Sequence, residues 1–449
     1  YINIMLIRSI SGVRGLTGQD ITPELSISYA RALHLFFPDG IIISGRDSRP
    51  SGEDIAEAMM NELNRLGRTV IDCGIVPTPT VQFMVNNTEA VGGFIITASH
   101  NPIEWNGLKF VRSDSTFFHS QDCNQLFELV DKNEYVEKAD ERGIIWPEAN
   151  AIQKHVIACV SLSCIDLNRI KQKKFKIVID AVNGAGSYAL PAMLEFLGCE
   201  VIQLNCEPNG EFTRGTEPIP ENLSALSNLV IEKRAHAGFA IDPDADRLAV
   251  VNEKGKPLGE EYTLVLAADG YLNDTKRSEK FVVNLSTSLA LDKLVHNKNC
   301  SVIRSKVGEI NVVNKMNEIG SELGGEGNGG VILRECHLGR DSLVGATMVL
   351  NRMSQTDNSL SEIYDSFPQF TIIKDKINLA GIEPDVLINY VESLFPDADK
   401  NIEDGVKFTW DDRWVHLRKS NTEPIMRIYA EAPDLKDAEQ LIAKVQSCI

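Results

Sequence analysis

The sequence lacks a long apolar segment. No stretch of about 18 or more apolar residues occurs, so no transmembrane helix is expected. It also lacks a basic N-terminal segment followed by an apolar core and a cleavage site, which argues against a secretory signal. Basic side chains are in deficit, with 45 Lys and Arg against 63 Asp and Glu and a net charge of −18. This balance disfavours nucleic acid or an anionic membrane as a partner.

Paired cysteines of the CxxC type are also absent. The nine cysteines are scattered along the chain, so neither a zinc ribbon nor a disulfide framework is indicated. Free thiols in a reducing compartment are the simpler interpretation. The sequence therefore predicts a cytoplasmic protein.

Short apolar runs alternate with helical patterns along the chain. A length of 449 residues accommodates three or four domains of about 100–150 residues each. Ile41–Ile43 predicts a strand, the segment from Ile55 to Leu66 has apolar residues at helical spacing, and Val70-Ile71 resumes a strand. This order predicts an α/β fold with a parallel sheet, in which ligands bind at the carboxyl ends of the strands.

A candidate nucleophile follows a predicted buried strand. Phe94–Ile96 is apolar and ends in Thr97–Pro102, a loop with Ser99 at its centre. A strand that fixes a hydroxyl and a loop that exposes it suit a nucleophile. Taken alone, the segment also fits a plain strand-to-loop turn. Lys109, shortly beyond it, is either a solvated charge or a phosphate clamp and general acid.

Three aspartates follow another predicted strand, 238–241. Asp242, Asp244 and Asp246 stand at alternate positions, and close carboxylates repel one another unless a cation lies among them. Hard oxygen ligands suit Mg²⁺. An EF-hand is excluded because the sixth loop position, Arg247, is not glycine. A solvated acidic turn is the alternative.

Three further loops carry polar or glycine-rich patterns. The segment 324–330 is the richest in glycine and contains Glu326, whose two carboxylate oxygens can accept from neighbouring hydroxyls. The segment 418–424 combines cations, hydroxyls and an amide, with Arg427 in the next strand, and suits an anion. Residues 7–15 are predicted to form a small-residue loop that carries Arg14. Each of the three is also compatible with a flexible or solvated loop.

Taken together, these motifs resemble those of the α-D-phosphohexomutases, the superfamily of phosphoglucomutase, phosphomannomutase and phosphoglucosamine mutase. The similarity spans the whole chain and rests on SGVRG, TASHNP with NGLK, DPDADR and RKSNTEP, in the family's order. It implies four domains around a central cleft, the first three mixed α/β domains of similar topology and the fourth a smaller α+β domain. We place them at 1–145, 146–255, 256–370 and 371–449.

The resemblance also implies a reaction, in which hexose 6-phosphate and 1-phosphate interconvert through a phosphoserine enzyme and a bisphosphorylated sugar. One Mg²⁺ per active site and a hexose bisphosphate as activator are expected. The resemblance assigns catalysis to Ser99, Arg14, His100, Lys109 and Arg247, metal binding to Ser99, Asp242, Asp244 and Asp246, sugar recognition to Glu326 and Asn328, and phosphate binding to Arg418, Ser420, Asn421, Thr422 and Arg427.

The chain departs from the common family pattern in the glycine-rich loop. Many phosphomannomutase/phosphoglucomutases have Glu-Met-Ser-Gly-His there, whereas this sequence has Asn328 in place of Ser and Gly330 in place of His. The departure puts the role of that His in doubt and leaves open whether His337 reaches the same space. Because an amide both donates and accepts, Asn328 favours glucosamine phosphate as substrate, on the route to UDP-N-acetylglucosamine.

Several alternatives remain at this point. Glucose or mannose phosphate is the alternative substrate, as for a phosphomannomutase/phosphoglucomutase. A metal-dependent serine phosphatase and a non-catalytic sugar-phosphate sensor are the alternatives of other classes. The expected partner is a small hexose phosphate, with neither nucleic acid nor membrane, and the chain is expected to act as a monomer or homodimer.

Overall fold

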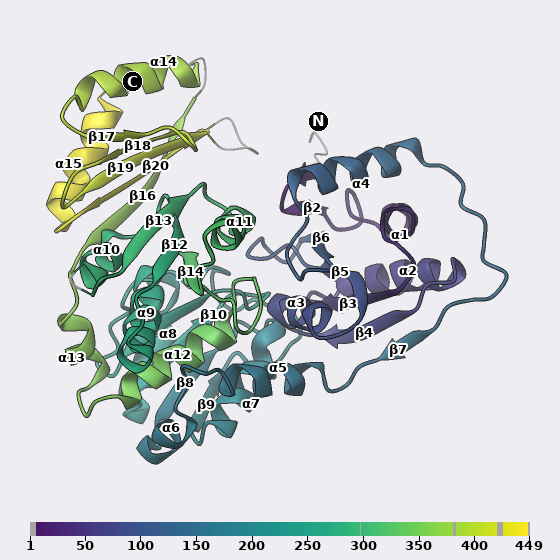
Figure 1. The fold of residues 1–449 in the computed structure, drawn as a ribbon, viewed down its shortest axis with the longest axis horizontal. Coiled ribbons are helices and arrows are strands. Elements are labelled where there is room, and N and C mark those ends of the chain that lie inside the picture. The colour runs from purple at the N-terminus through teal and green to yellow at the C-terminus, as the bar shows by residue number, and fades with distance from the viewer. Residues whose placement is uncertain (1–5, 297, 380–382, 420–424, 448–449) are drawn as a thin grey trace.

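The computed structural model describes residues 6–296, 298–379, 383–419 and 425–447, whose strands form four separate sheets (Figure 1). Each sheet is built from consecutive strands of the chain. The strand orders are β1-β2-β6-β5-β3-β4-β7, β11-β10-β8-β9, β13-β12-β14-β15 and β16-β20-β19-β18-β17. The α/β class with four sheets is confirmed, and the fourth sheet is antiparallel throughout.

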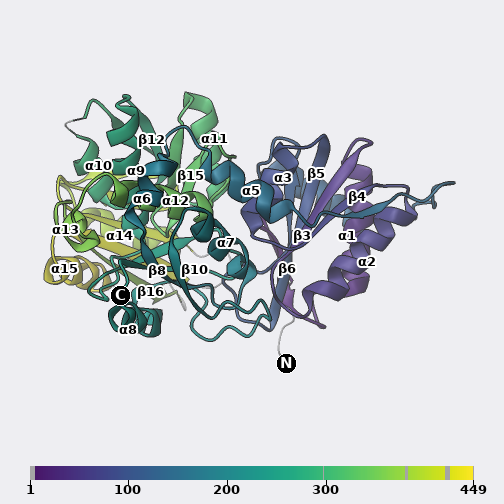
Figure 2. The same ribbon diagram turned by 90° about the horizontal axis from the view of Figure 1, so that it is seen from below.

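The first sheet has four helices around it and lies apart from the others in Figures 1 and 2. Its strands are β1 (Ile7–Ser9), β2 (Gly12–Leu16), β3 (Ile41–Arg46), β4 (Val70–Ile75), β5 (Ala90–Ile96), β6 (Trp105–Arg112) and β7 (Ile145–Pro147). Its helices are α1 (Pro23–Phe36), α2 (Gly52–Arg65), α3 (Thr78–Asn86) and α4 (Ser120–Lys132). Helix α2 forms because its apolar residues recur at helical spacing and bury one face against the sheet.

The second and third sheets continue the chain. The second contains β8 (Lys176–Asp180), β9 (Glu200–Leu204), β10 (Ala237–Ile241) and β11 (Leu248–Asn252), with α5 (Ala151–Val160), α6 (Leu167–Lys173), α7 (Ala189–Phe196) and α8 (Ser224–Lys233). The third contains β12 (Lys280–Asn284), β13 (Ser301–Ser305), β14 (Leu323–Glu326) and β15 (Gly330–Leu333), with α9 (Glu261–Thr275), α10 (Leu289–Val295), α11 (Glu309–Ile319), α12 (Ser342–Ser354) and α13 (Leu360–Asp365).

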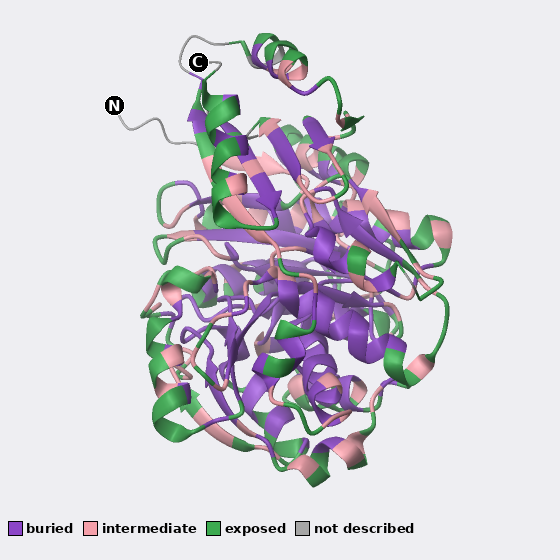
Figure 3. Ribbon diagram, turned by 90° about the vertical axis from the view of Figure 1, so that its left-hand side faces the viewer, coloured by how far each residue is buried: buried purple, intermediate pink, exposed green. Residues whose placement is uncertain are grey.

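The fourth sheet closes the chain. It contains β16 (Thr371–Asn378), β17 (Asp399–Asn401), β18 (Val406–Thr409), β19 (Trp414–Lys419) and β20 (Ile425–Ala432), with α14 (Pro384–Leu394) and α15 (Leu435–Gln446). Its apolar core is separate, whereas one continuous core joins the first three sheets. Buried residues accordingly run through the strands, and exposed ones lie on the outer helices (Figure 3). Across the described parts of the chain, no helix has both the length and the apolar character needed to cross a bilayer.

One arrangement of four strands recurs in the first three sheets. Each arrangement has one antiparallel strand at the edge, followed by three parallel strands. The orders are β6-β5-β3-β4, β11-β10-β8-β9 and β15-β14-β12-β13, with the antiparallel strand named first. The predicted similarity of topology is thus confirmed. The serine loop, the acidic loop and the glycine-rich loop each connect the last parallel strand to the antiparallel one, so all three occupy the same position in their sheets.

The loop predicted for residues 7–15 is wrong, because these residues form the antiparallel hairpin of β1 and β2. Strand β2 also pairs with β6, which supplies backbone partners that the small-residue composition does not indicate. Gly12 has φ 94° and lies so close to β6 that a Cβ would be 2.1 Å from the Leu108 carbonyl oxygen. Glycine is therefore required at this crossing.

Candidate functional site

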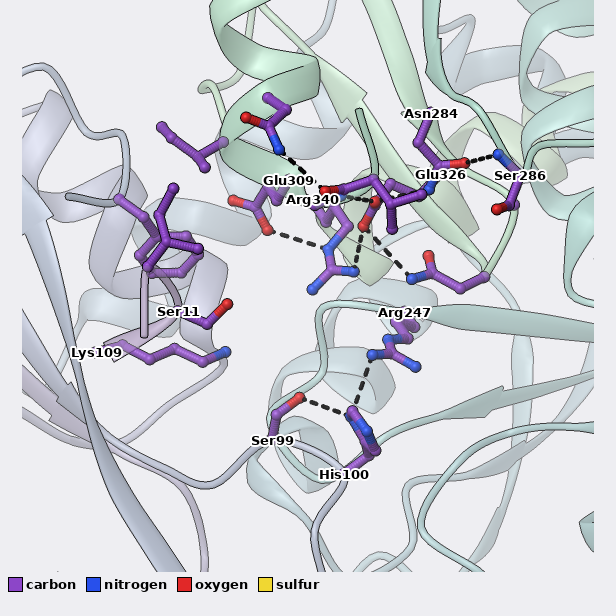
Figure 4. A pocket seen from close by; sticks show the side chains of 18 of the residues that line it. Ser11, Ser99, His100, Lys109, Arg247, Asn284, Ser286, Glu309, Glu326 and Arg340 are labelled. Carbon is purple, nitrogen blue, oxygen red and sulfur yellow. Dashed lines mark hydrogen bonds and ion pairs between the residues drawn. The ribbon is translucent and has the colours of Figure 1, made fainter. Parts of the chain in front are cut away.

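Residues of the first, third and fourth sheets and of loops beside the second sheet line one cavity of about 690 Å³. Its lining includes the predicted residues Arg14, Ser99, His100, Lys109, Arg247, Glu326, Asn328, Arg418 and Arg427. Figure 4 shows Ser99, His100 and Lys109 on one side, Glu326 on the other, and Arg247 between them. Ser420, Asn421 and Thr422 lie outside the described residues, and their predicted roles remain predictions.

Ser99 is held in an unusual backbone conformation just after β5. Its φ is 52°, in the left-handed region that few residues other than glycine adopt, and such conformations persist where neighbours fix them. Its N–H donates to Thr97 Oγ1 at 2.8 Å, and its carbonyl accepts from the Arg49 guanidinium at 2.9 Å. These contacts fix the loop and place the hydroxyl on the cavity wall.

His100 stands between the serine and a guanidinium. Its Nδ1 lies 3.4 Å from Ser99 Oγ and 3.1 Å from Arg247 Nη2. Burial, followed by the charges of Arg247 and Arg14, lowers the pKa of His100 well below its usual value. The imidazole is therefore neutral near pH 7, and its Nδ1 accepts, since a guanidinium only donates.

The acidic loop after β10 presents three free oxygens. Asp242 Oδ1 accepts from the N–H groups of Asp246 and Arg247, Asp244 Oδ2 accepts from Lys109 Nζ at 2.7 Å, and Asp246 Oδ2 accepts from Arg340 at 2.5 Å. The second oxygen of each aspartate is buried and has no hydrogen-bond partner. The ligand atoms of the three lie within 4.8 Å of one another. This donor set fits a hard divalent cation such as Mg²⁺.

The titration of two of these aspartates reflects the crowding. Burial and the neighbouring charges of Asp246 and Asp244 raise the pKa of Asp242 well above its usual value. Burial also acts to raise the pKa of Asp244, but Lys109, in direct contact, outweighs it and the pKa falls. A cation among the free oxygens would favour the charged form of both Asp242 and Asp244.

Cations surround the serine and the acidic loop. Lys109 on β6 is buried and lines the cavity beside Asp244. Arg14 on β2 donates to Asn101 Oδ1 at 3.0 Å, and Arg247 pairs with Glu217 at 2.9 Å. The two arginines and the lysine bring positive charge to the serine side of the cavity, as a phosphoryl group requires.

Glu326 is the last residue of β14 and is held on both oxygens. Oε1 accepts from Asn284 Nδ2 at 2.7 Å and from the Gly308 N–H at 2.9 Å, and Oε2 accepts from Arg340 Nη1 at 2.7 Å. Asn328 Nδ2 lies 3.5 Å from Oε2. Burial opposes ionisation, yet Arg340 and these donors outweigh it and lower the pKa of Glu326. A charged, oriented carboxylate therefore faces the cavity.

Two arginines of the fourth sheet face each other. Arg418 on β19 and Arg427 on β20 are directly paired in the antiparallel register. Like charges opposite one another destabilise a sheet unless an anion lies between them or nearby. Arg418 is partly neutralised by Asp404 at 2.8 Å, and both arginines line the cavity. The pair concentrates positive charge in a part of the cavity separate from the serine.

The sequence analysis missed several cavity residues, among them Arg340, Glu309, Asn284 and Glu217. None belongs to a recognisable motif, because their partners lie far along the chain. His337 is not among the lining residues. Its Nε2 lies 3.0 Å from Asp341 Oδ2, which His155 Nε2 also contacts at 2.8 Å.

Known proteins match the chain over nearly its full length. Family models described as phosphoglucomutase/phosphomannomutase α/β/α domains I, II and III match residues 6–137, 153–255 and 259–370, and the C-terminal domain model matches 388–447. A probable phosphoglucosamine mutase of Methanopyrus kandleri is 34% identical over 96% of this chain and 95% of its own. A phosphoglucomutase/phosphomannomutase of Thermococcus kodakarensis is also 34% identical, with the same coverage.

A solved structure shows the same fold. The phosphoglucomutase/phosphomannomutase family protein of Burkholderia thailandensis superimposes with a TM-score of 0.86. Its sequence is 24% identical, and the match covers 99% of this chain and 97% of that one.

Proposed function

The chain belongs to the α-D-phosphohexomutase superfamily, whose members are isomerases, and from this premise we propose that it is a phosphoglucosamine mutase. The reaction would interconvert glucosamine 6-phosphate and glucosamine 1-phosphate. The observation that carries the proposal is a single cavity that joins a constrained serine, a cation-accepting acidic loop, an oriented carboxylate and a separate pair of arginines.

The proposed cycle starts from Ser99 carrying a phosphoryl group on Oγ. A sugar hydroxyl attacks phosphorus, the P–Oγ bond breaks, and the hydroxyl proton ends on the departing Oγ, giving a bisphosphorylated sugar and a free serine hydroxyl. The sugar turns end for end, Oγ attacks its other phosphorus, and the P–O bond to the sugar breaks. In that return step His100 Nδ1, 3.4 Å from Oγ, would exchange its contact with Arg247 for the Oγ proton and pass this proton on to the departing sugar oxygen.

The charges of the cavity stabilise this transfer. Arg14, Lys109 and Arg247 neutralise the transferring group, since phosphoryl transfer depends mainly on positioning and electrostatics. The free oxygens of Asp242, Asp244 and Asp246 would hold Mg²⁺. When bound, the ion would supply further positive charge at the phosphoryl oxygens.

The arginine pair favours a mutase over a hydrolase or a sensor. A phosphatase that transfers to water needs no second anion site, whereas a bisphosphate that turns in place needs one for the phosphate that is not reacting. Arg418 and Arg427 provide it, with Ser420, Asn421 and Thr422 proposed to complete it. A sensor would have no need of a strained serine beside free metal-binding oxygens.

The position of Asn328 favours an amino sugar as the substrate. Its amide lies beside Glu326 and both donates and accepts, so it can serve a 2-amino group. A phosphomannomutase/phosphoglucomutase is the second candidate, because the Thermococcus kodakarensis relative with that name is as similar as the Methanopyrus kandleri protein.

The test is isomerisation with three substrates. The protein is incubated with Mg²⁺ and glucosamine 6-phosphate, glucose 6-phosphate or mannose 6-phosphate, with a hexose bisphosphate as activator, and products are followed by ³¹P NMR. Sugar 1-phosphate indicates a mutase, free phosphate a phosphatase, and neither a sensor. Fastest turnover of glucose or mannose phosphate would refute the proposed substrate.

Ser99→Ala tests the nucleophile. We expect isomerisation to fall by about 10⁴-fold or more, as for loss of other covalent nucleophiles. Ser115→Ala, in a turn outside the cavity lining, is the matched control and should retain activity. Near-normal turnover of Ser99→Ala would rule out the phosphoserine route. Light scattering of the same samples tests the expectation of a monomer or homodimer.

A further inference from the structure

Arg340 connects three loops that the cavity uses. Its side chain is nine-tenths buried, in the connection from β15 to α12. The guanidinium donates from Nε to Glu309 at 3.0 Å, from Nη1 to Glu326 at 2.7 Å and from Nη2 to Asp246 at 2.5 Å. Figure 4 shows the contacts with Glu309 and Glu326. One planar fork thus fixes a carboxylate at the start of α11, one at the end of β14 and one in the acidic loop.

The stem of Arg340 takes the space beside Gly330. Gly330 pairs directly with Glu326 across β14 and β15. A Cβ on Gly330 would lie 2.3 Å from Cδ and 2.8 Å from Cγ of Arg340. The φ of Gly330 is not in the left-handed region, so the backbone does not require glycine there. The requirement is spatial: any side chain at position 330 would displace the arginine.

The contacts of Asp246 and Glu326 explain what the arginine does. It holds Oδ2 of Asp246 and leaves Oδ1 without a hydrogen bond, 3.7 Å from Arg247 Nε and close to the other aspartates of the loop. It holds Oε2 of Glu326 in the same way, while Asn284 and Gly308 hold Oε1. Without the guanidinium, three buried carboxylates would repel one another and turn away.

We propose that Arg340 is a positioning residue that couples the metal-binding loop to the sugar-recognising Glu326, and that glycine at position 330 exists to admit it. The inference rests on the proposed function for the identity of the sugar phosphate. The Arg340 stem fills the space that a side chain at position 330 would take, and Arg340 rather than His337 lines the cavity there.

Arg340→Lys tests the three hydrogen bonds of the guanidinium, because lysine keeps the charge but cannot reproduce the planar arrangement of donors that holds three carboxylates at once. We expect binding of glucosamine 6-phosphate, measured by calorimetry with and without Mg²⁺, to weaken at least about 10-fold, and kcat to fall by about 10²-fold. The melting temperature should stay within about 5 °C of wild type. Arg334→Lys, on the same connection but outside the cavity lining, is the matched control. Wild-type binding by Arg340→Lys would overturn the proposal.

A double-mutant cycle tests independently whether glycine at position 330 makes room for Arg340. Gly330→Ala should weaken sugar-phosphate binding by about 10-fold and lower the melting temperature in the wild type, but change both little in an Arg340→Ala background. Equal effects of Gly330→Ala in the two backgrounds would overturn the proposal even if Arg340→Lys failed to fold. Failure of the proposed function would give a different result. The wild type would then isomerise none of the three hexose phosphates, but the melting temperatures of the four proteins in the cycle would still show whether Gly330 and Arg340 interact.

Discussion

At the scale of single residues, the acidic loop divides its oxygens between protein and ligand. Each aspartate gives one oxygen to protein donors and keeps the other buried without a hydrogen bond. A buried acceptor without a donor costs free energy, so the loop is strained electrostatically in the absence of a cation. The site is thus prepared for an ion at the expense of stability.

This division predicts that Mg²⁺ stabilises the folded protein. At 100 times its Kd, the ion should add about 2.7 kcal/mol to the free energy of unfolding, and a chelator should remove that gain. Differential scanning calorimetry in EDTA and in MgCl₂ measures it. Asp246→Asn should abolish the response, whereas Asp411→Asn in an exposed turn should keep it. An unchanged response in Asp246→Asn would contradict the assignment.

At the scale of elements, the three functional loops share a backbone device as well as a position. Ser99 has φ 52°, Ala245 has φ 57° and Gly329 has φ 87°, so each hairpin turns through one left-handed residue. Two of the three are not glycine, although a left-handed conformation is costly for them. The recurrence indicates that the turn itself, rather than its residue type, positions the functional side chains.

The sequence predicted the elements whose signals are local. Apolar runs ending in polar loops identified β5 and β10, and helical spacing identified α2, because each depends on neighbouring residues. The hairpin at residues 7–15 escaped, since its strands are stabilised by β6, nearly a hundred positions away. Arg340 escaped for the same reason: Asp246, its partner, is 94 residues distant. A periodic pattern reflects only residues that are close in the sequence, so it cannot indicate a contact between residues this far apart.

One buried polar junction joins three helices near the site. Thr80 of α3 contacts His155 Nδ1 at 2.9 Å, and His155 Nε2 contacts Asp341, whose other oxygen accepts from the first N–H groups of α12. Burial acts to lower the pKa of His155, but Asp341 outweighs it and raises the pKa to about 10. The imidazole is therefore charged in the folded state.

The junction predicts a pH dependence of stability. Because the folded pKa of His155 is above its unfolded value of about 6.5, its contribution is complete below about pH 6.5 and is lost as the pH rises towards about 10. Urea unfolding at intervals from pH 6 to 10 measures it. His155→Gln should be less stable than wild type at pH 6, and the difference should shrink with rising pH. A constant difference would contradict the predicted charge.

At the scale of the whole molecule, polar contacts attach the fourth sheet to the third. Lys407 Nζ donates to the Leu285 carbonyl at 2.5 Å, Glu431 accepts from the Leu289 N–H at 2.9 Å, and His416 Nδ1 lies 2.9 Å from Ser286 Oγ. No apolar cluster of the described residues joins this sheet to the others. Such an interface, made of polar contacts, fixes the position of the arginine pair relative to the third sheet.

Asp404 links that interface to the anion site. It accepts from the Val307 N–H at 3.0 Å and pairs with Arg418 at 2.8 Å. Asp404→Ala should therefore raise KM for the hexose phosphate by about 10-fold with little change in kcat, because Arg418 loses the contact that orients it while the groups around Ser99 are unchanged. Steady-state kinetics against the control Asp411→Ala measures this. A fall in kcat at unchanged KM would contradict it.

Because each sheet consists of consecutive strands, a ribosome delivers them one after another, and each can form as it emerges. The serine, the acidic loop and Glu326 are therefore in place before the last sheet is synthesised. Arg418 and Arg427 are synthesised after all three, so a nascent chain assembles the serine side of the cavity before it gains the arginine pair.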